Sequence, residues 1–274
     1  MMRSLWTGAS GMTSQQLAVD TIANNIANVN TTAFKRERLE FQSLLYQTLI
    51  SSGQNPELVG NRPANLQVGH GVRPVASTRN FTMGTLEPTG NVTDFAINGH
   101  GFFTINRGLT DETVAFTRDG AFQLSPAGGG LMLVTSQGYR VLDSGGNTIS
   151  FDVDINLQHL AVTREGFFTV RGPDGNTIDL GIQLGIAQFP NRQGLESIGG
   201  NLFIETAASG APVSEATGSV GAVSNILQGH LERSNVQIAE EMVDLIVSQR
   251  AFELNSRIIQ TSDEMLQQAN NMRR

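Results

Sequence analysis

The sequence predicts a multidomain α+β protein. Its N- and C-terminal helices pair as a coiled-coil inner domain, and a β-rich central domain and an extended arm lie between them in the chain. Glycine and proline are absent from Met12 to Ser52 and from His230 to Arg274, although the 274 residues include 30 Gly and 8 Pro. Both terminal segments carry apolar residues at heptad spacing, and the middle alternates short apolar runs with Gly, Asn and Asp.

Each terminal segment carries one stripe that needs a partner, because its members follow one another at steps of four and three. Polar members such as Gln16, Gln249 and Asp263 weaken the stripes. We therefore expect both ends to be frayed in the monomer and to become ordered against each other and against neighbouring copies. The alternative is an ordinary antiparallel helix pair inside one globular domain. The stripes are Leu5, Ala9, Met12, Gln16, Val19, Ala23 and Ile26, and then Ile238, Met242, Leu245, Gln249, Phe252, Ser256, Ile259, Asp263 and Leu266.

Two polar features of the first segment also bear on assembly. Asn24 and Asn28 stand one helical turn apart, which places two amides where they can bond to adjacent subunits; a solvated amide face is the alternative. The small residues of Gly8-Ala-Ser-Gly11 allow close backbone approach. The candidate assembly residues are Leu5, Met12, Gln16, Val19, Asn24, Ile26, Asn28, Ile238, Met242, Leu245, Gln249, Phe252, Ile259 and Leu266.

Shifts in composition divide the chain into domains. Residues 1–30 and 225–274 are expected to form the discontinuous helical inner domain. Residues 31–80 continue the first helix and then become an extended arm or linker, because Gly and Pro recur there with little periodicity. Residues 81–215 form the β-rich outer domain, and 216–224 form the return linker.

An internal repeat supports the β-rich assignment of the middle. Each copy reads as a turn whose glycine can adopt φ > 0, followed by a strand that buries a phenylalanine. A period-two hydrophobic pattern explains the repeat without invoking a site. The copies begin at Ile97, Phe116 and Val162, and their core residues are Gly101, Phe103, Gly120, Phe122, Gly166 and Phe168.

Composition excludes several classes of function. A net charge of −7 without a basic face argues against nucleic acid, and the cluster Lys35, Arg36 and Arg38, diluted by acids, is interpreted as a solvated face. Cysteine is absent, which excludes thiol chemistry. The four histidines stand apart without ligand spacing, so we expect no metal, cofactor or catalytic site and no enzyme activity. No spanning helix and no cleaved secretory signal are expected.

Long motifs along the chain resemble one family. Ile22-Ala-Asn-Asn-Ile-Ala-Asn-Val-Asn-Thr-Thr-Ala-Phe-Lys35 closely resembles the N-terminal signature of bacterial flagellar rod and hook proteins. The resemblance continues through Phe41–Thr48, Val68–Val75, Ala96–Phe103, Phe116–Gly120, Gly229–Val236 and Ser248–Ser256. The stretch from Phe41 to Pro74 is most similar to the distal rod members, which favours them over proximal rod or hook members.

The resemblance implies a structural subunit of the distal rod. Its copies would stack helically into a hollow drive shaft that transmits torque from motor to hook and leaves an export channel. It also implies a basal-body location in a rod that spans the periplasm, and export through the flagellar export apparatus without a cleaved signal. The implied partners are further copies, other rod and hook proteins at the ends, and surrounding ring proteins. The alternatives are a proximal rod or hook subunit, a glycan-binding β module on a helical stalk, and a cell-wall hydrolase.

Overall fold

The computed structural model describes residues 2–50, 65–108, 113–127, 130–152, 159–171, 177–217 and 224–272. The chain is α+β, with a helix near each end and a β-rich middle, and it divides into two compact units. The helical unit holds both ends of the chain, so the β unit is inserted between its parts in sequence. The helical unit comprises Met1–Ala27, Glu37–Arg79 and Gln237–Arg274, and the β unit comprises Asn28–Arg36 and Asn80–Val236.

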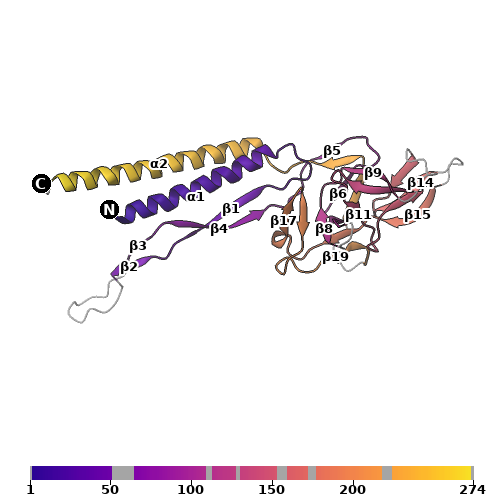
Figure 1. Cartoon of the computed structure of the whole chain (residues 1–274), viewed down its shortest axis with the longest axis horizontal. Coiled ribbons are helices and arrows are strands. Elements are labelled where there is room, and N and C mark those ends of the chain that lie inside the picture. The colour runs from indigo at the N-terminus through magenta and orange to yellow at the C-terminus, as the bar shows by residue number, and fades with distance from the viewer. Residues whose placement is uncertain are drawn as a thin grey trace. The chain divides into compact units, whose positions relative to one another are not determined.

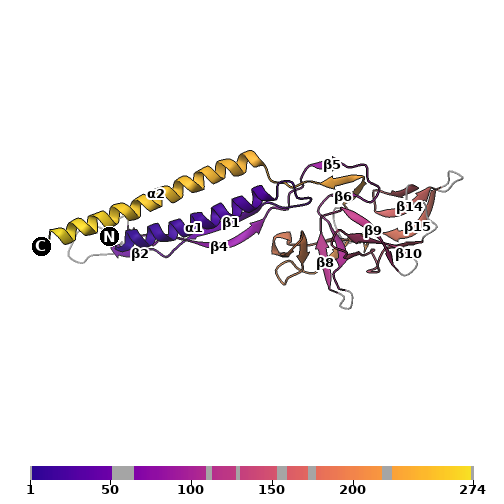
Figure 2. The same cartoon turned by 45° about the horizontal axis from the view of Figure 1, so that its top comes forward.

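The helical unit is built around α1 (Met2–Ala27), which packs against α2 (Ile238–Asn271). The two helices run side by side in opposite directions (Figures 1 and 2). The other side of α1 contacts the antiparallel hairpin of β1 (Glu37–Ser43) and β4 (Val72–Arg79). Helix α1 is therefore the central element of this unit.

The structure corrects the expected helix extension over residues 31–80. Helix α1 ends at Ala27, and the chain then forms β1 and β2 (Gln47–Ile50), which pairs with β3 (Leu66–Val68). The side chain of Asn25 directs this change, because its Oδ1 accepts a hydrogen bond from Glu37 N (3.0 Å) and its Nδ2 donates to Glu37 O (2.8 Å). Those two bonds satisfy the backbone N–H and C=O of Glu37, which a neighbouring strand would otherwise satisfy. Residues 51–64 of the expected arm lie outside the described residues.

The second boundary correction lies at the other end of the chain. Helix α2 begins at Ile238, while β20 (Asn225–Gln228) and β21 (His230–Glu232) pair with strands of the β unit. The expected inner domain of 225–274 therefore contributes its first residues to the β unit. Residues 218–223 of the expected return linker lie outside the described residues.

The β unit is antiparallel at every strand pair in the described part of the chain. Its largest sheet follows the order β12-β10-β11-β7-β8-β18-β17, with β16 and β9 joined to β7 and β10 and with β19 joined to β16. Three smaller sheets are β13-β14-β15, β20-β6 and β21-β5. The strands not yet given are β5 Leu86–Pro88, β6 Phe95–Asn98, β7 Phe102–Asn106, β8 Val114–Thr117, β9 Phe122–Ala127, β10 Gly130–Thr135, β11 Arg140–Val141, β12 Ser150–Asp152, β13 Leu160–Val162, β14 Phe167–Arg171, β15 Thr177–Gln183, β16 Ile186–Gln188, β17 Glu196–Gly199, β18 Leu202–Ile204 and β19 Val213–Ser214.

Phenylalanines from the three repeat copies lie in the main core of the β unit. Phe103, Phe122 and Phe168 are all buried, and the rings of Phe103 and Phe122 meet edge to face with centroids 5.1 Å apart. A second buried cluster contains Phe102, which contacts the rings of three other phenylalanines. Aromatic edge-to-face packing supplies stabilisation beyond the apolar area that it buries.

The repeat glycines serve two different purposes. Gly166 has φ of 90°, as the turn pattern predicts. Gly101 and Gly120 do not have positive φ, which corrects the expectation for those copies. A Cβ at Gly120 would overlap Phe95 O, and one at Gly101 would overlap the Ile186 side chain. In these two copies the glycine is required by close packing rather than by backbone conformation.

Candidate assembly interface

Helix α1 meets α2 along a row of small and polar residues. Ser4 Oγ lies 3.1 Å from Ser262 Oγ. Gly8 faces Ile259, and Gly11 faces the Asn255 side chain so closely that a Cβ there would lie 2.8 Å from Asn255 Nδ2. The close approach expected of the Gly8–Gly11 segment is seen at Gly8, where an added Cβ would lie 3.6 Å from the backbone oxygen of Asn255.

The expected apolar stripes lie beside this contact row rather than on it. Ser4, Gly8 and Gly11 precede by one residue the stripe positions Leu5, Ala9 and Met12. Ile259 belongs to both sets. The displacement has a physical cause, since the closest helix contact needs small residues, whereas an apolar heptad pattern selects large ones. The assembly role of the stripe residues stays a prediction.

Four predicted assembly residues share one groove in the helical unit. Gln16 and Val19 of α1 and Gln249 and Phe252 of α2 line it together with Glu253, and its volume is about 400 Å³. The structure therefore brings the middle of both expected stripes to one place.

Helix α2 leaves most of its apolar side chains in solvent. Of its 34 residues, those that are buried are Glu241, Ser248 and Ser262. The expected assembly role of this helix stays a prediction at this point. The exposed apolar residues of α2 are Ile238, Met242, Val243, Ile246, Val247, Phe252, Leu254, Ile258 and Met265.

The asparagine pair Asn24 and Asn28, expected on one helical face, lies at the end of α1. Asn28 follows the end of α1 and belongs to the β unit, where its Oδ1 accepts a bond from Thr31 Oγ1 (3.1 Å). The assembly role of Asn24 and Asn28 stays a prediction. The buried amide is that of Asn25, whose Nδ2 also donates to Glu241 Oε2 of α2 (3.2 Å). Asn25 and Glu241 were missed because neither falls on an apolar stripe.

A buried cluster of three charged side chains lies in the β unit and was not expected from the sequence. Lys35 Nζ donates to Glu232 Oε1 at 2.5 Å, and Arg118 Nε donates to Glu232 Oε2 at 2.9 Å. The side chains of Lys35 and Glu232 are fully buried, and that of Arg118 is 1% exposed. The remaining N–H groups of Arg118 donate to the carbonyl oxygens of Ile97, Gly99 and Gly101. Complete pairing of this kind is what allows charged groups to be buried.

The cluster joins segments that are distant in sequence. Lys35 follows α1, Arg118 follows β8, and Glu232 ends β21 shortly before α2. Glu232 Oε1 accepts a further bond from Gly84 N (2.9 Å), and Lys35 Nζ donates to Thr82 O (2.8 Å). The chain is therefore held within the β unit just after it leaves α1 and just before it enters α2.

Electrostatics within the cluster shift two pKa values. Burial lowers the pKa of Lys35 to about 8, and nearby Arg118 adds to the effect while Glu232 opposes it. Burial raises the pKa of Glu232, but the charges of Arg118 and Lys35 outweigh it and hold that pKa below its usual value. Lys35 is therefore not part of a solvated basic face, which corrects that interpretation, whereas Arg38 is exposed.

The chain offers a direct test of this burial, because Lys35 is its only lysine. We expect reductive methylation of the native chain to leave Lys35 unmodified, slowed by more than about a hundredfold relative to the unfolded chain in urea. Mass spectrometry of peptides measures the modification. In the variant Arg250→Lys the new lysine replaces a side chain that is 73% exposed and serves as an internal reference. Equal labelling of both lysines would contradict the buried cluster.

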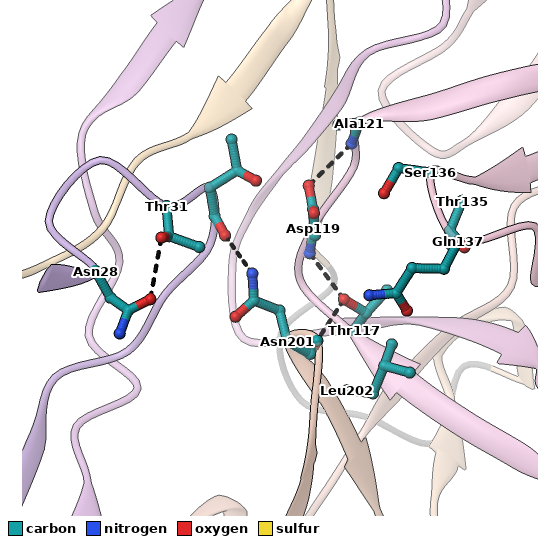
Figure 3. Close-up of a pocket in the computed structure, with 12 residues that line it drawn as sticks. Asn28, Thr31, Thr117, Asp119, Ala121, Thr135, Ser136, Gln137, Asn201 and Leu202 are labelled. Atoms are coloured by element: carbon teal, nitrogen blue, oxygen red, sulfur yellow. Dashed lines mark hydrogen bonds between the residues drawn. The ribbon is translucent and has the colours of Figure 1, made fainter. Parts of the chain in front are cut away.

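A polar pocket of about 340 Å³ lies where the segment after α1 meets the β unit's turns (Figure 3). Asn201 Nδ2 donates to Thr32 O (2.8 Å), and Thr117 Oγ1 donates to Asn201 O (2.9 Å). Burial raises the pKa of Asp119, although its Oδ1 accepts a bond from Ala121 N (3.1 Å). These bonds fix the Asp-Gly turn and hold the segment that contains Thr32, which is a structural role.

Two features are absent from the part of the chain that the structure describes. None of its helices is long and apolar enough to cross a membrane. Nor do the described residues include a group of three or more His, Asp or Glu side chains placed to hold a metal ion.

Three family descriptions match this chain. They are "Flagella basal body rod protein" at residues 5–35, "Flagellar hook protein FlgE/F/G D1 domain" at 96–166 and "Flagellar basal body rod FlgEFG protein C-terminal" at 227–272. The first match covers most of α1 and the segment that ends at Lys35, and the second includes Arg118. The third includes Glu232 and all of α2, so each family segment contributes one member of the buried cluster.

Full-length relatives extend the match to the whole chain. The chain is 48% identical to "Flagellar basal-body rod protein FlgG" of Borreliella burgdorferi over 275 residues, covering 100% of both chains. It is 42% identical to the protein of that name from Buchnera aphidicola, covering 97% of this chain and 98% of the relative, and 37% identical to that of Bacillus subtilis, covering 100% of both.

The chain belongs to the family of bacterial flagellar rod and hook proteins, whose members are structural parts of the flagellum. Within that family it is most like the distal rod proteins, as its full-length similarity to the FlgG relatives shows. None of the three matching families is a family of enzymes.

Proposed function

We propose that the protein is the structural subunit of a flagellar distal rod, which polymerises helically into a hollow drive shaft. The observation that carries this proposal is the exposed apolar surface of α2 in a chain whose full-length relatives are rod proteins. The shaft transmits torque from motor to hook and leaves a channel for export.

Helical association is favoured by the way the helical unit is built. Burial gains roughly 25 cal/mol per Å² of apolar surface, and α1 covers only the side of α2 that carries Glu241, Ser248 and Ser262. The remaining apolar side chains need partners from other copies. We propose that the two helices form coiled-coil contacts in the polymer, with the groove at Val19 and Phe252 receiving a side chain of a neighbouring helix.

We further propose that the rod lies in the basal body and spans the periplasm, with other rod and hook proteins at its ends and ring proteins around it. The subunit reaches this place through the flagellar export apparatus without a cleaved signal. The chain has no cysteine, so no disulfide must be reduced before it passes a narrow channel unfolded.

Hydrogen exchange on the monomer and on assembled rods tests the assembly proposal. We expect fast exchange of residues 2–27 and 238–271 in the monomer and strong protection after assembly, because few of their side chains are buried in one chain. Residues 95–108 should be protected in both states and serve as the control. Protection of both helices already in the monomer, unchanged by added protein, would favour a self-contained binding module instead.

A further inference from the structure

A second polar pocket of the β unit, with a volume of about 300 Å³, has a different electrostatic character from the pocket of Figure 3. Two titratable residues line it, His100 and Arg192, and both are basic. Among the described residues that line it, none is acidic. The lining residues are Asn80, Phe81, Thr82, His100, Pro190, Asn191, Arg192 and Gln193.

The two basic residues are in direct contact. Arg192 Nη1 lies 2.8 Å from His100 Nδ1. A guanidinium only donates, so Nδ1 must accept and the imidazole is neutral with its proton on Nε2. The charge of Arg192, partial burial and the more distant Arg118 lower the pKa of His100. Two adjacent basic groups without an acid form an arrangement that a bound anion would stabilise.

Two buried cations next to the pocket, Lys35 and Arg118, add to its positive charge. Thr82, which lines the pocket, accepts a bond from buried Lys35, and Gly99, next to His100, accepts bonds from buried Arg118. Lys35, Arg118 and Arg192 are three cations, and the carboxylate of Glu232 forms ion pairs with two of them, Lys35 and Arg118.

A second acid, Glu215, lies close to Gly101, but its carboxylate already accepts hydrogen bonds from other groups. Glu215 accepts bonds from Ser224 N, Ser224 Oγ and Gln188 Nε2. It lies against Gly101, within the protein rather than in the pocket lining.

We propose that this pocket binds an oxyanion, a carboxylate or a phosphate, on the guanidinium of Arg192. The neutral ring of His100 can donate from Nε2, and the side-chain amides of Asn80 and Gln193, which also line the pocket, can supply further donors. A carboxylate side chain of a second copy and a free phosphate ion share this chemistry. The site can be tested on the monomer, so the test does not depend on the proposed assembly.

Histidine NMR titration of the full-length monomer tests the site with inorganic phosphate as the probe and chloride at matched ionic strength as the reference. We expect phosphate to raise the pKa of His100, because a nearby anion favours the protonated ring. The NMR signals of His230, whose Nδ1 contacts Gln228 O at 2.9 Å, serve as the control and should be the same in phosphate and in chloride. If phosphate leaves the pKa of His100 unchanged, or changes the signals of His100 and His230 equally, the proposal is overturned.

Two variants assign the effect to Arg192. Arg192→Gln should weaken phosphate binding by about tenfold or more, since it removes the charged donor, and should raise the pKa of His100 in chloride. Arg250→Gln removes an exposed arginine of α2 and should leave phosphate binding unchanged. Equal binding by the wild type and Arg192→Gln would overturn the site.

The same titration on assembled rods in chloride distinguishes the two sources of the anion. If assembly alone raises the pKa of His100, the oxyanion is a carboxylate of a neighbouring copy. If only added phosphate raises it, the site takes a free ion.

Discussion

Replacing Glu232 with glutamine destabilises the β unit by about 3–5 kcal/mol, because it leaves two buried cations without their counter-charge. In the wild type both carboxylate oxygens are engaged, Oε1 by Lys35 and Gly84 N and Oε2 by Arg118. An amide of similar size keeps one acceptor but carries no charge. Urea unfolding followed by circular dichroism measures the loss.

Two further variants separate this effect from a general loss of charge. Glu87→Gln breaks a pair with Arg233 whose side chains are about half exposed, 54% and 49%, so it should cost less than about 1 kcal/mol. Lys35→Met leaves Glu232 paired with Arg118 and should cost less than Glu232→Gln. A Glu232→Gln chain as stable as the Glu87→Gln chain would show that the cluster contributes little.

The same cluster gives stability a predicted dependence on pH. The folded pKa of Glu232 lies below its ordinary value of 4.5, so the unfolded chain binds protons first as the pH falls. Its stabilising contribution is complete above pH 4.5 and is lost as the pH falls through the depressed pKa. For Lys35 the folded pKa of about 8 lies below 10.5, so stability from this group rises between those values.

The sequence predicted the two helices and the β-rich middle because both rest on local periodicity. Absence of Gly and Pro was a weaker guide, since it fits strands as well as helices. The segment Glu37-Arg-Leu-Glu-Phe-Gln-Ser43 became strand β1, where the bonds between Asn25 and Glu37 fix its start. A side chain 12 residues away decided that boundary, and no local pattern contains such a bond.

Long-range pairs were the part of the site that the sequence could not predict. Arg118 and Glu232 are 114 residues apart, and Lys35 and Glu232 are 197 apart. Lysine, arginine and glutamate are residue types that usually lie on the protein surface, so none of the three indicates burial by itself. One signal was present, since a single lysine among 18 basic residues points to a specific role. The helix contact was displaced by one residue because Gly8 and Gly11, rather than apolar side chains, set it.

Replacing Ile246 with aspartate is expected to abolish rod growth while leaving the monomer folded. The side chain is 55% exposed on α2, so the free energy of unfolding of the monomer should change by no more than about 0.5 kcal/mol. Assembly would lose the burial of an isoleucine and would bury an unpaired charge, which should raise the critical concentration by more than about a hundredfold. Sedimentation of the polymer at increasing protein concentration measures that threshold.

Matched substitutions on the same helix identify the cause. Gln260→Asp adds the same charge at an exposed position without removing apolar surface, so a smaller rise in critical concentration is expected. Leu245→Asp alters a half-buried residue and should weaken the helix pair in the monomer as well as assembly. If Ile246→Asp assembles at the wild-type concentration, the exposed face of α2 is not the contact between copies. If the prediction holds, the difference in critical concentration between Ile246→Asp and Gln260→Asp measures what apolar burial alone contributes to the rod.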